Sequence, residues 1–402
     1  MSDVTASRSG QSGLAWAGFD PRAFSLIGLL AAIALVFHFL SGGLFLTPRN
    51  LYNLVVQTSV VAILAAGMTL VIATRNIDLS VGSILGFVGM LIALFQIQIF
   101  PMDAAWNWPL TIMVGIIAGG LIGAWHGAWI AYGGVPSFVV TLGGLLIFRG
   151  AAFEVAQGKT LAPFQPTYQL LGGGIDGAIG EANSWILFVV LMSLYGLGEV
   201  VLNRRQARLG FATLPAARFV RFALFCVVGM AFVWAMNSYD RPRSDIGRGI
   251  PAPALILLAV VLCMEFIARF TTFGRYVYAI GGNLEAARLT GIPTKSTVLW
   301  VFVTMGVLCG IAAVVTTARL NAGTSSTGEL LELSAIAAAV IGGVSLAGGR
   351  GTVAGAVVGA LVIQSLDSGM VLVGASSSQR MVAIGLVLIA AVWTDHRLSR
   401  KT

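Results

Sequence analysis

The sequence divides into about twelve segments that are apolar over nearly the length of a membrane crossing. A helix needs about 20 mainly apolar residues to cross the hydrocarbon core of a bilayer. Such segments lie at 24–46, 54–73, 79–100, 109–131, 136–156, 184–202, 217–236, 251–268, 298–318, 332–347, 353–373 and 379–393. Several are short or glycine-rich, and broken helices of this kind can enter a membrane without crossing it. The sequence therefore predicts an all-α polytopic membrane protein with about 10–12 transmembrane helices, forming one transmembrane domain over 1–402.

Composition excludes the soluble classes of protein. Charged residues make up 10% of the chain and hydrophobic residues 57%, whereas soluble domains carry about 25% charged residues. The net charge of +8 does not indicate nucleic-acid binding, because the basic residues are scattered between apolar segments and do not cluster on one face. The three cysteines are far apart within apolar runs. We therefore expect neither a disulfide framework nor a metal site.

Lys and Arg residues are distributed unevenly between the two sides of the predicted bundle. If the N-terminus is cytoplasmic and all twelve segments cross, sixteen of the 24 basic residues lie on the cytoplasmic side. Cytoplasmic loops are enriched in Lys and Arg. This favours a cytoplasmic tail at 1–22, a basic cytoplasmic loop at 203–217, a cytoplasmic loop at 269–297 and a cytoplasmic tail at 394–402. The loop 237–249 opposes this orientation, since it would place three arginines outside.

An internal repeat suggests that the chain contains two related halves. When the sequence is compared with itself at a shift of 273 residues, positions 62–86 contain seven identities, among them Ala62 with Ala335, Gly82 with Gly355 and Gly86 with Gly359. Each copy reads as a helix, a break rich in glycine and polar residues, and a second helix. Repeated halves with broken helices at matching positions are typical of transporters.

A short polar segment, "NLEAARLTGIP" at 283–293, separates two apolar stretches. Asn283 is a favourable N-cap, Glu285 places negative charge in the first turn, and Gly291 with Pro293 ends the helix. The predicted helix, 284–290, is about 10 Å long and too short to span lipid. The small side chains of Ala286 and Ala287 would allow this helix to fit into a groove on a partner protein. An ordinary solvent-exposed loop helix would account for the same residue spacing equally well.

Four segments together resemble a known family. They are "NIDLSVGS" at 76–83, "VPSFVVTLGGLLIFRG" at 135–150, "YAIGGNLEAARLTGI" at 278–292 and "AIAAAVIGGVSLAGGRGTVAGAVVGAL" at 335–361. In the same order, they resemble the permease subunits of ATP-binding-cassette (ABC) importers for monosaccharides, the family of ribose, galactose and xylose permeases. The insertion around 185–237 is similar to that of the xylose-type permeases.

The resemblance implies an importer in a bacterial inner membrane, with both termini of the permease in the cytoplasm. Two copies of the permease would form the translocation path in the lipid bilayer. Each copy would dock its short helix on a separate ATP-binding subunit, and a periplasmic or extracellular sugar-binding protein would deliver the substrate. ATP and Mg²⁺ would be used by the ATPase, so this chain would bind no cofactor and would not be an enzyme.

The resemblance also implies two groups of functional residues. Coupling to the ATPase would involve Gly281, Gly282, Asn283, Glu285, Ala286, Ala287, Arg288 and Gly291. The candidates for the translocation path are Asn76, Asp78, Phe138, Thr141, Arg149, Gln364 and Asp367. Charged groups in spans are costly and often functional. Alternatively, Asp78 could cap the helix that begins near Leu79, and Arg149 and Asp367 could be structural pairs or extend to the membrane interface.

Two nucleotide-binding patterns in the sequence are incomplete. The "GKT" at 158–160 has Phe153 where a P-loop requires its first glycine. The "GRGTVA" at 349–354 fits a loose dinucleotide-binding pattern but lies between apolar helices, where close helix packing or a substrate-path break is expected instead.

The alternative function is an ion-coupled secondary sugar transporter, which would also have repeated halves. Coupling to an ion normally requires acids within the membrane. These are scarce here, and the alternative rests on Glu154 and Asp367.

Overall fold

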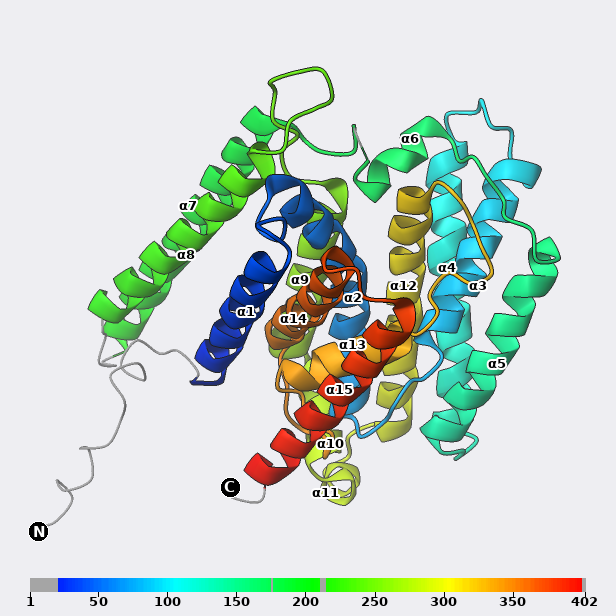
Figure 1. The fold of residues 1–402 in the computed structure, drawn as a ribbon. Coiled ribbons are helices and arrows are strands. Elements are labelled where there is room, and N and C mark those ends of the chain that lie inside the picture. The colour runs from blue at the N-terminus through cyan, green and yellow to red at the C-terminus, as the bar shows by residue number, and fades with distance from the viewer. Residues whose placement is uncertain (1–20, 175, 210–214, 400–402) are drawn as a thin grey trace, which may run out of the picture.

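The computed structural model describes residues 21–174, 176–209 and 215–399, which fold into one bundle of helices (Figure 1). The helices are α1 (Pro21–Leu40), α2 (Pro48–Ala73), α3 (Val81–Leu94) with a π-helical turn η2 (Phe95–Ile99), α4 (Asn107–Ala131), α5 (Ser137–Ala156), α6 (Pro166–Gln169) with a 3₁₀ turn η3 (Leu170–Gly172), α7 (Glu181–Arg208), α8 (Pro215–Asn237), α9 (Ala252–Phe270), α10 (Thr272–Gly282), α11 (Leu284–Leu289), α12 (Thr294–Leu320), α13 (Leu331–Ile341), α14 (Val353–Leu372) and α15 (Ser377–Ser399).

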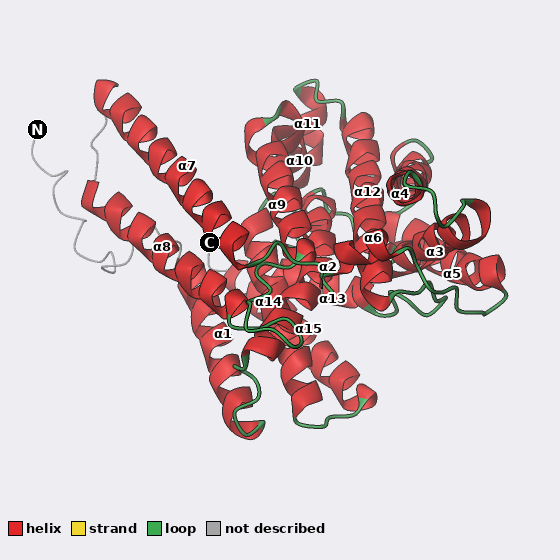
Figure 2. Ribbon diagram, turned by 90° about the horizontal axis from the view of Figure 1, so that it is seen from above, coloured by secondary structure: helices red, strands yellow, loops and turns green. Residues whose placement is uncertain are grey.

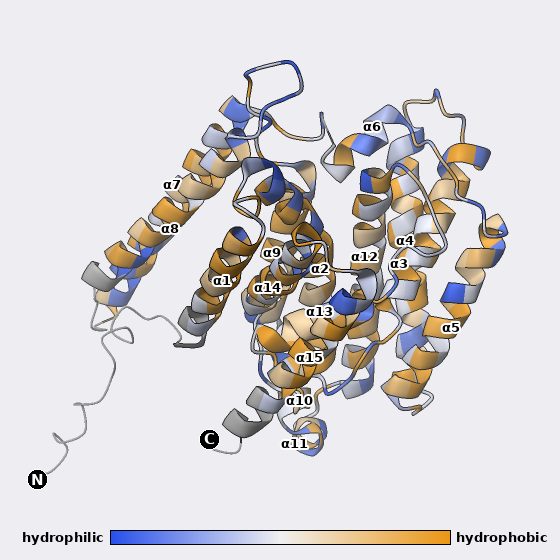
Figure 3. Cartoon of the chain, viewed as in Figure 1, coloured by the Kyte–Doolittle hydropathy of each residue, from blue (hydrophilic) through white to orange (hydrophobic). Residues whose placement is uncertain are grey.

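The predicted fold class is confirmed. Each of the twelve apolar segments coincides with a helix, and the described residues outside the helices form only isolated β-bridges. Nine helices in the described part of the chain are long and apolar enough to cross a membrane, and shorter apolar helices lie at Ser25–Leu40, Leu331–Ile341 and Ser377–Ala390. Figure 3 shows apolar residues along the bodies of the helices and polar residues concentrated at their ends and in the loops.

Helix α2 forms the centre of the bundle. The most apolar window of α2 is 89% buried, whereas that of α7 is 0% buried. Helices α9, α12, α13 and α14 pack around α2, and the view from above places them on several sides of it (Figure 2). A helix that is apolar all round is suited to such a position, because every face of it meets other apolar side chains.

Helices α4 and α12 pack backbone against backbone. Glycines recur every four residues on α4, at Gly115, Gly119, Gly123 and Gly127, and they face Gly306, Gly310 and the backbone of Phe302 and Leu299 on α12. A Cβ atom at Gly119 would overlap the carbonyl oxygen of Gly306, and one at Gly306 would overlap the carbonyl oxygen of Gly119. Lipid provides no hydrophobic force that drives helices together, so the close approach of α4 and α12 stabilises the pair through van der Waals packing.

Both copies of the predicted repeat adopt a helix–break–helix arrangement. In the first, residues 74–80 separate α2 from α3, and in the second, residues 342–352 separate α13 from α14. The copies differ in length, because α2 has 26 residues and α13 has 11. Eleven residues rise only about 16 Å, so α13 is one of the short segments expected to enter the membrane without crossing it alone.

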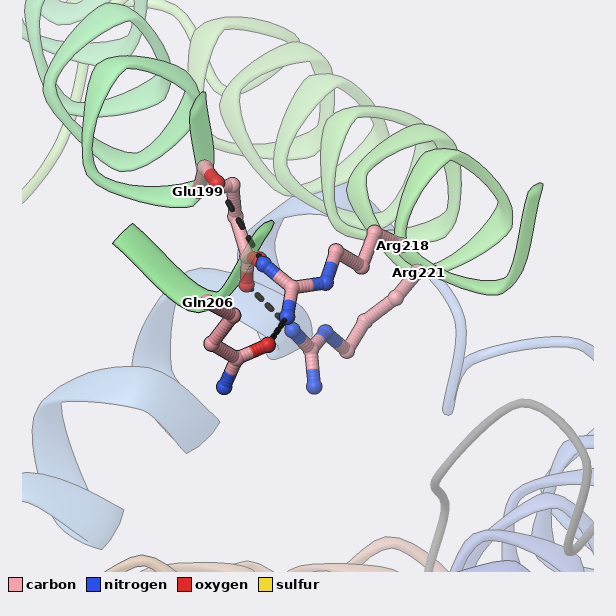
Figure 4. A network of polar contacts seen from close by, with 4 residues as sticks. All are labelled: Glu199, Gln206, Arg218 and Arg221. Atoms are coloured by element: carbon pink, nitrogen blue, oxygen red, sulfur yellow. Dashed lines mark hydrogen bonds and ion pairs between the residues drawn. The ribbon is translucent and has the colours of Figure 1, made fainter. Parts of the chain in front are cut away.

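Helices α7 and α8 form a hairpin beside the rest of the bundle, joined at one end by charged side chains (Figure 4). The Glu199 carboxylate on α7 pairs with Arg218 and Arg221 on α8, and Arg218 also donates to the Gln206 side chain. The Glu199 side chain is only 13% exposed. Because a partly buried carboxylate is costly without a partner, the two arginines stabilise the hairpin in this position.

Helix ends extend past three of the predicted boundaries. Helix α7 continues to Arg208 and α8 begins at Pro215, so most of the predicted 203–217 loop is helical, and its residues 210–214 lie outside the described residues. Helix α15 continues to Ser399, through most of the predicted tail 394–402. The length of an apolar segment predicts where a helix leaves the lipid, but the helix itself can continue into water beyond that point. Of the predicted tail at 1–22, residues 1–20 lie outside the described residues.

We expect Gly119→Ala to destabilise the protein by about 1–3 kcal/mol, because the added methyl group forces α4 and α12 apart. The thermal unfolding midpoint of the purified chain in detergent measures this. Gly143→Ala on α5 is the control, since a Cβ atom there meets nothing within 4 Å. Equal midpoints for the two variants would contradict the packing argument.

Candidate functional site

Helices α10 and α11 form a compact unit, which we call the α11 unit. The end of the bundle where this unit lies is called the α11 end. The short helix expected at 284–290 is present as α11, with Thr290 as its C-cap. The Asn283 side chain accepts hydrogen bonds from the backbone N–H groups of Glu285 and Ala286, both at 3.0 Å. Gly291 has a φ of +80°, a left-handed conformation that glycine adopts readily after a helix. Local sequence therefore determines where α11 begins and ends.

The base of this unit lies against both breaks of the repeat. Gly281, at the end of α10, is buried, and a Cβ atom there would overlap the Ala73 carbonyl oxygen and contact the Gly349 N–H. The two breaks are also linked to each other, since Gly349 N–H donates to the Ala73 carbonyl at 2.9 Å. Gly281 is therefore required as glycine because two backbone segments meet it.

Arg75 joins the first break to the same unit. Its Nε donates to the Gly281 carbonyl at 2.7 Å and its Nη2 donates to the Gly282 carbonyl at 2.8 Å. Its φ of 61° is left-handed, which is uncommon for a residue with a side chain. The backbone turn and the two charge-assisted hydrogen bonds together hold α10 and α11 against residues 74–76.

Tyr278 provides the corresponding link to the second break. Its hydroxyl donates to the Gly351 carbonyl at 3.0 Å. Burial raises the pKa of Tyr278, so the hydroxyl keeps its proton and remains a donor at neutral pH. The unit is thus tied to the first break by Arg75 and to the second by Tyr278.

The coupling residues expected from the sequence separate into two groups. Gly281 and Ala287 are buried against the bundle, whereas Gly282, Asn283, Glu285, Ala286, Arg288 and Gly291 are exposed. Glu285 and Arg288 form no ion pair with any described residue. Leu289 is 85% exposed and Leu284 is 38% exposed, so α11 presents two leucine side chains at its surface. The exposed side of α11 thus combines apolar side chains with unpaired charges.

The path candidates near the first break lie together. The Thr141 hydroxyl on α5 is within 3.3 Å of the Ile77 carbonyl, and the Asn76 side chain donates to the backbone and hydroxyl of Thr74. Asp78 is 1% exposed, and its carboxylate accepts from the Ser80 N–H and hydroxyl. Helix α3 begins at Val81, so Asp78 orders the turn before it and does not cap a helix at Leu79. Phe138, on the same α5, is exposed.

Arg149 binds a non-helical segment that crosses part of the bundle. Its Nη1 lies 3.1 Å from the Ser325 carbonyl and 3.2 Å from the Thr327 carbonyl, in the 321–330 connection between α12 and α13. Gly82 and Gly86 on α3 leave room for the backbone of Gly328 and Thr327. Irregular backbone among spans needs such cover by protein. Arg149 therefore satisfies backbone carbonyls here, and its Nη1 has no carboxylate partner among the described residues.

Gln364 and Asp367 lie in a different place, on the wall of a cavity of about 330 Å³ between α13, α14 and α15. The Gln364 side chain donates to the Gln57 side chain at 2.9 Å, and Asp367 pairs with Arg380 at 3.0 Å. The path candidates thus form three groups within one copy of the chain: the first break, the Arg149 site and this cavity.

Several site residues escaped the sequence analysis. The charge distribution identifies Arg75 only as one of the basic residues. Gly349 and Gly351 lie in the predicted second break and in the resembling segment 335–361, but neither pattern predicts that they contact α10. Glu332, on α13, is 7% exposed with one carboxylate oxygen unpaired. The repeat gave no signal for Glu332, because the corresponding residue in the first copy is the uncharged Ser59. The exposure of Leu289 could have been suspected, since it is a leucine at the C-terminal end of a polar helix.

Comparison with known proteins supports the resemblance. Residues 50–392 match the family described as "Branched-chain amino acid transport system / permease component". The chain is 41% identical to the xylose transport system permease protein XylH of Escherichia coli strain K12, over 95% of this chain and 93% of the relative. It is 40% identical to XylH of Haemophilus influenzae over 93% of this chain and 96% of the relative. It is 33% identical to the ribose import permease protein RbsC of E. coli strain K12 over 93% of each. No solved structure matches the chain.

We expect Arg75→Gly to loosen α11 from the bundle. Glycine keeps the left-handed backbone but removes two hydrogen bonds from a charged donor, each worth about 1.5–3 kcal/mol. Amide hydrogen exchange in 281–289 should then become at least about tenfold faster. Arg350→Gln in the second break is the control, because the Arg350 side chain makes no hydrogen bond to a described residue. Unchanged exchange in Arg75→Gly would show that Arg75 does not hold the unit.

Proposed function

The chain belongs to the family of transport-system permease components, and from this premise we propose that it is the membrane-spanning subunit of an ATP-dependent importer for a monosaccharide. One observation carries the proposal: the identity of 41% to a xylose transport permease extends over 95% of the chain. The relatives are named transport permeases, which agrees with a transport role and with the expectation that the chain is not an enzyme.

Xylose is the sugar that we propose. The chain is 41% identical to the xylose permease of E. coli, compared with 33% for the ribose permease and 31% for the D-allose permease of the same organism. Since these values come from similar shares of the chain, the difference in identity favours the first sugar over the other two.

The α11 unit is the part that we assign to the partner ATPase. Its outer surface combines the apolar Leu289 with Glu285 and Arg288, which have no ion-pair partner in the described chain. Docking of a groove on this surface would bury the leucine, and a displacement of α11 would reach both breaks through Gly281, Arg75 and Tyr278. The breaks precede α3 and α14, so one movement would reorient a helix in each half.

This assignment places the α11 end in the cytoplasm of a bacterium, together with both termini, and the membrane is the inner membrane. A second copy of the chain would complete the translocation path, which is consistent with the separation of the path candidates into three groups in one copy. ATP and Mg²⁺ would be bound by the ATPase, and a sugar-binding protein would approach the opposite end. The path candidates stay as proposed, with the first break as the group closest to the moving unit.

An ion-coupled secondary transporter is the less favoured alternative. Of the acids that the alternative required, Asp367 is paired with Arg380, so its charge is already compensated. The relatives are named as permease components of transport systems, which also weighs against this alternative.

We expect Leu289→Asn to reduce sugar uptake by at least about tenfold, because burial of a leucine contributes about 1.5–3 kcal/mol to docking of the ATPase. The same loss is expected for Glu285→Arg, which reverses a charge on the docking surface. The permease itself should keep its unfolding midpoint, since both side chains are exposed. Leu209→Asn, at another exposed leucine next to α7, is the matched control and should transport normally. Normal uptake with Leu289→Asn and Glu285→Arg would refute docking at α11.

We expect uptake of xylose into membrane vesicles to require ATP and a soluble xylose-binding protein, and to persist after a protonophore is added. Ribose and D-allose at the same concentration should be transported less. Uptake that stops with the protonophore and needs no ATP would favour the secondary transporter, and equal uptake of the three sugars would contradict the assignment to xylose.

A further inference from the structure

A cavity of about 280 Å³ lies at the α11 end, between the first break, the last turn of α4, α11 and the first turns of α12. Three cationic side chains line it: Arg75 from the break, Arg288 from α11 and Lys295 from α12. Arg75 is far in the sequence from the other two, and only the fold brings the three to one place. The rest of the wall is apolar or neutral, including Ile130 and Val298.

The positive charge of this cavity is not compensated within the described chain. No carboxylate is among the lining residues, and none of the three cations forms an ion pair with a described residue. The Lys295 ammonium lies 5.9 Å from the centre of the Tyr132 ring, and it makes no ion pair with a described residue. The Asp78 carboxylate, in the same break as Arg75, is engaged by Ser80. The cavity therefore suits an anion.

The cavity also lies at the ends of two candidate membrane spans, where lipid headgroups are expected. Its walls include the last residues of α4 and the first residues of α12, which are both candidate membrane spans. Exposed aromatic side chains occur at the same ends of these two helices and in the turn after α4, at Trp129, Tyr132 and Trp300, and the Tyr132 ring is the one that Lys295 approaches. Exposed Trp and Tyr at the ends of spans mark the membrane interface, and basic pockets between spans on the cytoplasmic side bind anionic headgroups.

We propose that this cavity binds the phosphate group of an anionic phospholipid, held by Arg288 and Lys295 together with Arg75. The apolar part of the wall faces the start of the acyl chains, which a free phosphate ion would leave uncovered. Because Arg75 also holds α11 through Gly281 and Gly282, the bound lipid would sit beside the element that we assign to the ATPase. The binding itself requires neither ATPase nor sugar, so it can be tested on the permease alone.

The test measures lipid binding to the purified full-length chain in detergent by native mass spectrometry, with phosphatidylglycerol and with phosphatidylcholine. The pocket variant is Arg288→Gln/Lys295→Gln, and the matched control is Arg204→Gln/Arg205→Gln, which removes two exposed arginines from α7. Each basic residue near an anionic headgroup contributes about fivefold in affinity. We expect the pocket variant to bind phosphatidylglycerol about 25-fold more weakly than the wild type, while the control and phosphatidylcholine binding stay unchanged.

Two results would overturn the proposal. The first is equal phosphatidylglycerol affinity in the pocket variant and the wild type; if that variant also fails to retain the ATPase, the cavity receives an acidic side chain of that partner instead. The second is displacement of the bound lipid by inorganic phosphate at an equal concentration, which would assign the cavity to the free ion. The Lys295→Gln single variant leaves α11 intact, so weaker binding in this variant cannot result from misplacement of that helix.

Discussion

Close approach of backbones at glycine is the interaction on which this bundle depends. Inside a membrane, apolar side chains gain little by leaving lipid for protein, so helices associate through van der Waals contact and satisfied polar groups. The glycines of α4 and α12 allow this contact along a whole span, Gly82 and Gly86 admit the irregular 321–330 segment beside α3, and Gly281 admits two break segments against α10. A side chain at any of these positions would separate the elements that the candidate site brings together.

The same principle explains the arrangement at the α11 end. A helix as short as α11 has little stability of its own, and it is held in place by its N-cap and by its neighbour α10. Helix α10 in turn contacts both breaks, through Arg75 on one side and Tyr278 on the other. Breaks in paired positions are the parts of a transporter that are able to change conformation. A short surface helix attached to both of them would, in the function that we propose, connect the partner ATPase to the two halves of the bundle.

Much of this was predictable because its signals are local. The twelve apolar segments were identified by length and hydropathy, and each is a helix. The bounds of α11 followed from Asn283, Gly291 and Pro293, which act within one or two turns. Less was predictable where partners are distant: Arg75 bonds to a carbonyl 206 residues further along the chain, and the candidates Asn76, Arg149 and Asp367 belong to three separate groups. Helices α7 and α15 extend past their predicted ends, because the length of an apolar segment indicates how far a helix runs within lipid and not where the helix ends.

The sequence by itself determined the fold class, the positions of the helices and the polar interruptions between them, since hydropathy and capping act over short stretches of chain. Only the tertiary structure decided that Gly281 and Arg75 meet at the base of α11, that the chain before α13 runs through the bundle as an irregular segment, and that Arg75, Arg288 and Lys295 surround one cavity. The physical reason is that these contacts depend on how closely two backbones approach, and that distance is set by the packing of the whole bundle.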